Sequence, residues 1–196
     1  MKRHHASLAI LFFSFVIPGK AQQRTDQPWQ FEMSAGIHSF YAPVAGLELK
    51  RPELITMAGL GKPLGKKQLF EISLQLGYAR NNYQGDAVFL QLLGKFQPVI
   101  ARRIETGIGF GFGYRIALYP SKAQKWNDGE WKEGVPFKGI WQVPVQFSLG
   151  WRSLQPSKYE IRPFVAYQLQ ALLGYNPDLS PLPVSAGLLG IKIQKH

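Results

Sequence analysis

The sequence feature that most constrains the fold is the stretch Arg103 to Leu118, RIETGIGFGFGYRIAL. Apolar side chains alternate there with glycines and charges, and a period of two over this length indicates a β-strand. One face carries Ile104, Thr106, Ile108, Phe110, Phe112, Tyr114, Ile116 and Leu118, and the other carries Glu105, Gly107, Gly109, Gly111, Gly113 and Arg115. A glycine row weakens an ordinary sheet. The pattern therefore favours a small barrel whose glycine face lines a crowded interior and whose apolar face is turned outward to lipid.

Seven further runs alternate in the same way, so we expect eight strands in all. The other runs are residues 29–37, 53–64, 70–78, 88–96, 141–151, 161–170 and 184–194, of which 53–64 is the least regular. Connections after the second, fourth and sixth runs are short, whereas those after the first, third, fifth and seventh are mostly longer and more polar. This predicts an all-β, eight-stranded, up-and-down antiparallel transmembrane β-barrel with short turns and both termini in the periplasm.

The alternative fold is a soluble, lipocalin-like β-protein that places the large apolar face inside. The interior of an eight-stranded barrel is only just wide enough to be filled by side chains, and so many aromatic rings would overfill it. Turning them outward leaves glycine, serine, alanine, glutamine and a few charges inside. We predict that Phe31, Phe70, Ile108, Phe110, Phe112 and Phe147 face lipid, and that Trp29, Trp141 and Trp151 form an aromatic girdle at the interfaces.

The N-terminus has the pattern of a secretory signal peptide. Lys2 and Arg3 precede an apolar core that is shorter than the roughly 20 residues of a membrane-spanning helix, and cleavage is expected after Ala21. The expected organisation is a signal peptide at 1–21, a linker at 22–27 and a barrel at 28–196. Because the chain has no cysteine, disulfides, thiolate metal sites and a lipid-modified N-terminal cysteine are excluded.

These features together resemble the small outer-membrane β-barrels of the OmpA/OmpX type from Gram-negative bacteria. The resemblance is carried by Ala21-Gln22 at the predicted cleavage site, by the TGIGFGFGYR run and by the closing strand GLLGIKIQ. It implies a monomer in the outer membrane, without a cofactor, that is structural or binds a partner through its loops. The chain ends in Ile193-Gln194-Lys195-His196, whereas many such barrels end in an aromatic residue that the barrel assembly machinery reads.

Eight charged residues are expected to point into the lumen: Glu32, Glu71, Lys95, Glu105, Arg115, Arg152, Arg162 and Lys192. A buried unpaired charge costs several kcal/mol, so we expect these groups to form a network that packs the lumen. Basic residues outnumber acidic ones five to three in this set. A narrow pore that favours anions is therefore an alternative, and the positive balance also suits the phosphates of lipopolysaccharide.

Few residues offer catalytic chemistry. After cleavage the chain retains two histidines, His38 and His196, which gives catalytic triads and multi-histidine metal sites little to build on. A barrel enzyme that modifies lipid A with His38 and Ser39 is the remaining enzymatic alternative, although adjacent strand residues point to opposite faces. The basic residues form no clustered groove for nucleic acid. We therefore expect no enzymatic activity, no metal and no cofactor.

Overall fold

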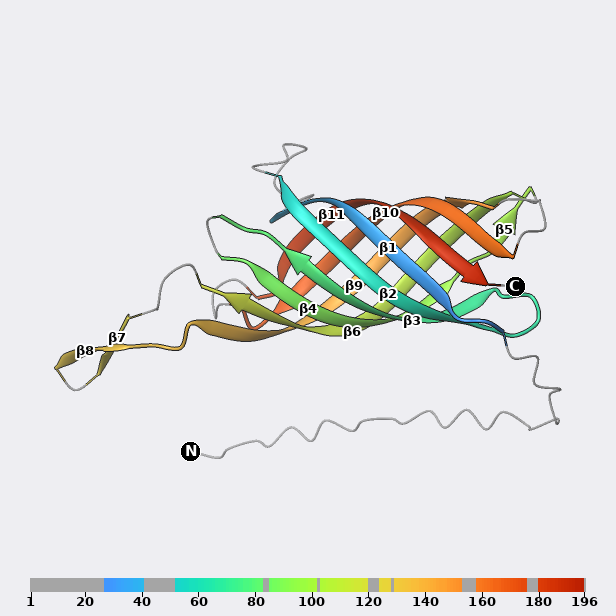
Figure 1. The fold of residues 1–196 in the computed structure, drawn as a ribbon. Helices are drawn as coiled ribbons and strands as arrows, with labels where there is room; N and C mark the ends of the chain where they lie inside the picture. The colour runs from blue at the N-terminus through green and yellow to red at the C-terminus, as the bar shows by residue number, and fades with distance from the viewer. Residues whose placement is uncertain are drawn as a thin grey trace, which may run out of the picture.

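The computed structural model describes residues 27–40, 52–82, 85–101, 103–119, 124–127, 129–152, 158–175 and 180–195. Eight long strands form the barrel of Figure 1. They are β1 (Gln30–Phe40), β2 (Glu53–Leu64), β3 (Phe70–Ala79), β4 (Ala87–Phe96), β6 (Ile104–Leu118), β9 (Phe137–Trp151), β10 (Tyr159–Leu173) and β11 (Leu182–Lys195). The predicted signal peptide and His196 lie outside the described residues.

Each long strand pairs antiparallel with the next long strand along the chain, and β11 pairs with β1 to close the barrel. The closing register runs from Gln30 opposite Gln194 to Phe40 opposite Val184. Closure leaves no long strand with a free edge. The predicted eight-stranded up-and-down antiparallel barrel is thus confirmed, and every predicted run overlaps one of its strands.

The outward face of the barrel is apolar. In β6 the residues Ile108, Phe110 and Phe112 are 49 to 65% exposed, while Glu105 and Arg115 are buried. The same alternation exposes Phe31, Phe70 and Phe147 on other strands. A soluble barrel with this face inside does not describe the molecule.

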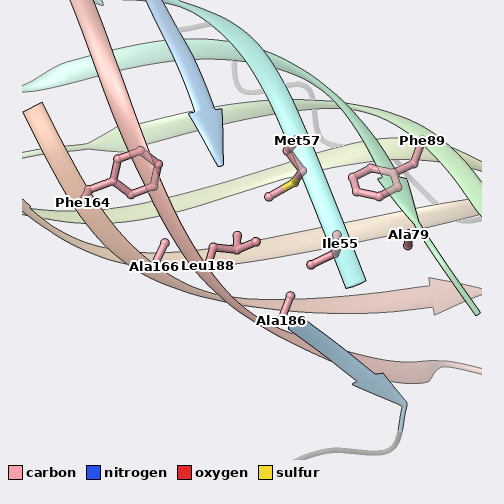
Figure 2. Packing of buried hydrophobic residues seen from close by; sticks show 8 residues of the cluster. All are labelled: Ile55, Met57, Ala79, Phe89, Phe164, Ala166, Ala186 and Leu188. Atoms are coloured by element: carbon pink, nitrogen blue, oxygen red, sulfur yellow. The ribbon is translucent and has the colours of Figure 1, made fainter. Parts of the chain in front are cut away.

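The inward face is more apolar than the sequence pattern predicted. Two buried clusters lie inside: one is Ile55, Met57, Ala79, Phe89, Phe164, Ala166, Ala186 and Leu188 (Figure 2), and the other is Ala117, Ile140, Leu172, Leu182 and Val184. Glycines make room for the two rings, because a Cβ at Gly77 would lie 2.1 Å from Phe89 Cζ and one at Gly190 would lie 2.4 Å from Phe164 Cζ. Small luminal residues therefore accommodate aromatic side chains that also point inward.

Three short strands were not predicted. β5 (Val99–Ile100) pairs with the start of β6, at the barrel end where β11 finishes. β7 (Gln124–Asn127) and β8 (Glu130–Glu133) form a hairpin that projects from the opposite end (Figure 1). Its turn contains Gly129 with a φ of 87°, a conformation that glycine adopts at little cost.

Connection lengths differ less between the two ends than the sequence suggested. The connection over residues 152–158, at the end that carries the termini of the barrel, is as long as the one over 80–86 at the other end. The two longest connections, over residues 41–52 and over residues 119–136 with the hairpin, both lie at that other end. Within the described residues, no helix is long and apolar enough to span a membrane.

Candidate functional site: the barrel lumen

The first charged group in the lumen is centred on Lys95 of β4. Lys95 Nζ lies 2.6 Å from Glu32 Oε2 and 3.4 Å from Glu71 Oε1, and all three side chains are at most 5% exposed. Antiparallel pairing places Glu71 directly opposite Lys95, while Glu32 reaches them from β1. Three strands are thereby joined by buried ion pairs.

A row of glutamines extends this group across the lumen. Gln75 Nε2 donates to Glu32 Oε1 at 2.9 Å, Gln91 Nε2 donates to Gln75 Oε1 at 2.6 Å, and Gln142 Nε2 donates to Gln91 Oε1 at 3.0 Å. The row starts on β9, crosses β4 and β3 and ends at the carboxylate on β1. This chain of hydrogen bonds crosses the lumen and holds each of its side chains in one orientation.

The second charged group is centred on Glu105 of β6. Its carboxylate accepts from Arg162 Nη1 at 3.0 Å and from Lys192 Nζ at 2.9 Å. Arg162 Nε also lies 3.3 Å from Glu160 Oε1, and Arg152 Nε lies 3.0 Å from the same oxygen. Arg152 is the outermost member, with 28% of its side chain exposed.

The two groups together contain four carboxylates, Glu32, Glu71, Glu105 and Glu160, and four cations, Lys95, Arg152, Arg162 and Lys192. Sequence reasoning missed Glu160, although it lies on the same face of β10 as Arg162, two residues away. With Glu160 included, the network is balanced rather than basic.

Arg115 does not join this network, contrary to the prediction. It lies ten residues along β6 from Glu105, roughly 33 Å at the rise of a β-strand, so the two residues occupy opposite ends of the barrel. Arg115 is 2% exposed, donates to Gln170 Oε1 at 3.3 Å and lies over the Phe89 ring at 5.7 Å from its centroid. Among the described residues it forms no ion pair with a carboxylate.

His38 and Ser39 are buried but do not form a catalytic pair. His38 Nε2 donates to the carbonyl oxygen of Arg80 at 2.8 Å, and no hydrogen bond between His38 and Ser39 is found among the described residues. Ser39 Oγ donates to the Phe40 carbonyl at 3.3 Å. The described part of the chain also holds no group of three side chains suited to a metal ion.

The three predicted girdle residues are exposed and make contacts typical of interfacial aromatics. Lys62 Nζ lies 5.3 Å from the Trp29 ring centroid, and the Arg103 guanidinium lies 5.9 Å from that of Trp151. Trp141 packs edge-on against Tyr114, with centroids 5.1 Å apart.

Solved structures share this fold, whereas no family model and no curated protein matches the chain. Neisserial surface protein A aligns with a TM-score of 0.55 at 6% identity, over 85% of this chain and 96% of that one. The N-terminal β-barrel domain of Pseudomonas aeruginosa OprF gives 0.51 at 10%, over 84% and 96%. Ail, the attachment invasion locus protein of Yersinia pestis, gives 0.53 at 10%, over 86% and 98%. The chain therefore has the fold of small eight-stranded outer-membrane barrels.

Proposed function

We propose that this chain, which has the fold of small outer-membrane barrels, is a non-enzymatic outer-membrane protein that presents the β7–β8 hairpin to a binding partner outside the cell. The observation that carries the proposal is the contrast between a filled barrel and a projecting hairpin. The barrel interior is occupied by ion pairs, glutamines and apolar clusters, so the external loops remain for recognition.

Insertion into a bilayer accounts for the outward face. Side chains such as Leu74, Phe110 and Leu189 are 47 to 68% exposed on the barrel surface, and this apolar belt is larger than a soluble monomer normally carries. A closed barrel satisfies all backbone groups of its strands internally, which lipid requires. Trp29 and Trp151 at one end and Trp141 towards the other suit the two membrane interfaces.

The balanced charge network supports a closed lumen over an anion pore. Three buried cations and the partly exposed Arg152 are matched by four buried carboxylates, and a row of glutamines crosses the lumen. A pathway for anions needs cations that are not already neutralised by fixed partners. Arg115 alone does not provide one, because it lies among the apolar residues of the other half of the barrel.

The hairpin has the properties of a recognition element. Within the described ranges β7 and β8 form a two-stranded sheet separate from the barrel sheet. Trp131 is 65% exposed and Val135 is 59% exposed, and exposed aromatic residues are common anchors of protein interfaces. Ail, which shares the fold, has been solved in complex with the heparin analogue sucrose octasulfate, which supports ligand binding as a role for such a barrel.

The proposal includes the orientation and the general partners. The termini of the barrel and the turn between β2 and β3 lie in the periplasm, and residues 1–21 are removed on export. Outer-membrane lipid and lipopolysaccharide surround the barrel, and the barrel assembly machinery inserts it.

Epitope accessibility tests this orientation directly. One epitope is inserted at Gly129 in the hairpin, and a matched one at Gly65 in the turn between β2 and β3. We expect antibody to label intact cells through the first epitope only, and to reach the second only after the outer membrane is permeabilised. Labelling of the Gly65 epitope on intact cells, with the Gly129 epitope hidden, would refute the proposal.

Two further measurements separate the competing functions. The folded protein should fractionate with outer membranes and migrate faster on a gel before boiling than after it. In planar bilayers the wild type should give no steady conductance, whereas a small pore would. Lipid A modification that disappears in His38→Ala and Ser39→Ala variants would establish the enzymatic alternative instead.

A further inference from the structure

An apolar groove of about 490 Å³ crosses the outside of the barrel near the end that carries its termini. Its floor is the backbone row Gly150, Phe164 and Gly190, which are direct register partners on β9, β10 and β11. No side chain of these three residues enters the groove, because two are glycines and the ring of Phe164 points into the lumen (Figure 2). The walls are the outward side chains of Ile104, Leu149, Trp151, Pro163, Val165 and Leu189.

A cation lies at the edge of this groove. The Arg103 guanidinium lies over the ring of Trp151, which is itself a wall of the groove, and Arg103 is exposed. Within the described part of the chain, no carboxylate forms an ion pair with Arg103. The backbone N–H of Arg152 donates to the Arg103 carbonyl at 2.7 Å, so a second arginine is adjacent. Arg152 forms an ion pair with Glu160, which is shared with Arg162.

The combination of apolar walls and an unpaired arginine defines the chemistry of the occupant. A guanidinium presents parallel N–H donors that match two oxygens of a phosphate, and it does so most strongly when no carboxylate competes. A second copy of the chain does not meet this requirement, because a two-fold contact would bring another unpaired arginine to the same edge. A phospholipid meets both requirements, with an acyl chain against the walls and a phosphate at the arginine.

We propose that this groove is a specific binding site for an anionic phospholipid, whose acyl chain lies between the β9 and β10 walls and whose headgroup phosphate is bound by Arg103. The inference rests on the proposed membrane location and orientation, which put this end of the barrel in the leaflet that faces the periplasm. Leu189 and Gly190 also line a larger apolar groove over β1, β2 and β3.

Native mass spectrometry tests the site. The full chain is refolded without lipid in detergent and titrated with phosphatidylglycerol or with phosphatidylcholine of the same acyl chains. Both lipids carry a phosphate, but the choline ammonium of phosphatidylcholine offsets its charge and is repelled by Arg103. We therefore expect one phosphatidylglycerol to bind about tenfold more tightly than phosphatidylcholine. Arg103→Gln should reduce this preference to none.

Matched variants separate the site from general effects. Lys66→Gln with Lys67→Gln removes two exposed charges at the same barrel end but on the opposite wall, and should leave the preference unchanged. Val165→Trp fills the groove and should abolish tight binding, whereas Leu74→Trp, on the outward face of β3 and outside both grooves, should not. Gel migration before boiling confirms that each variant is folded.

Three results would overturn the proposal: equal affinity for the two lipids, an unchanged preference in Arg103→Gln, or displacement of phosphatidylglycerol by lipid A at equal concentration. If the wild type folds into vesicles and one of these results is found, this inference alone fails. If the wild type does not fold into vesicles, the membrane proposal fails, and the lipid site fails with it.

Discussion

Replacing Glu105 by Gln keeps the shape of a buried side chain and removes the charge at the centre of the second ion group. Glu105 accepts from Lys192 Nζ at 2.9 Å and from Arg162 Nη1 at 3.0 Å, and these side chains are 4 to 8% exposed. After the substitution Arg162 retains Glu160 as a partner. Lys192 loses the only carboxylate with which it forms an ion pair among the described residues.

The structure allows the size of the effect to be estimated. Two opposite charges about 4 Å apart attract by about 4 kcal/mol at an effective dielectric constant of 20. Removing one partner of a buried pair usually costs about 3 to 5 kcal/mol, because the remaining charge stays buried. Since Arg162 is compensated and Lys192 is not, we expect Glu105→Gln to lower the free energy of unfolding by about 3 kcal/mol, the lower end of this range.

Arg115→Met is the matched comparison, because Arg115 is equally buried but stands outside the network. Exchanging a buried charge for an apolar side chain of similar volume is often neutral or stabilising by about 1 to 4 kcal/mol. Urea unfolding in phospholipid vesicles, followed by tryptophan fluorescence, measures both variants, with exposed Glu130→Gln as a control. An unchanged midpoint for Glu105→Gln, or an equal loss for Arg115→Met, would refute the reasoning.

Two further predictions concern packing and pH. Gly77→Ala would place a methyl carbon 2.1 Å from Phe89 Cζ, so we expect a loss of about 1 to 3 kcal/mol in the same unfolding assay, and the added Phe89→Leu change should restore most of it. The Tyr78 hydroxyl and then the Asn81 N–H donate to the Asp86 carboxylate and lower its pKa. Because the charged form is favoured in the folded protein, the contact is fully present above the ordinary pKa of 3.8 and is lost as the pH falls through the lowered pKa of the folded state. The protection of the Asn81 amide against hydrogen exchange, relative to its intrinsic rate, should therefore fall below this pH in the wild type. In Asp86→Asn this protection should not change with pH.

The strands could be predicted because one face of each is large and apolar. Alternation fails as a guide where both faces are apolar, as in β4, AVFLQLLGKF, in which Phe89 and Leu93 point inward while Val88 and Leu90 point outward. The inward ring of Phe89 was missed for this reason. Gly77 lies opposite Phe89, but interior crowding was predicted only for the glycine row of residues 107–113.

The partners within the lumen could not be predicted, because they depend on the stagger between strands. Glu32 and Lys95 form an ion pair across the lumen from β1 and β4, which are not adjacent in the sheet. The distance between residues on such strands depends on the stagger of the barrel, which cannot be derived from the alternation pattern. The β7–β8 hairpin was missed although Asp128-Gly129 is a strong hairpin signal. It lay within a connection that had been interpreted as a loop.

The central claim, that the outward apolar face of the barrel meets lipid, is tested most directly by spin labels on β6. The chain has no cysteine, so a single nitroxide can be attached at Phe112→Cys, or at Ile108→Cys and Tyr114→Cys, without removing native thiols. In vesicles, each label should collide readily with oxygen and rarely with a water-soluble nickel chelate. Free collision of the Phe112 label with the nickel chelate would contradict the account.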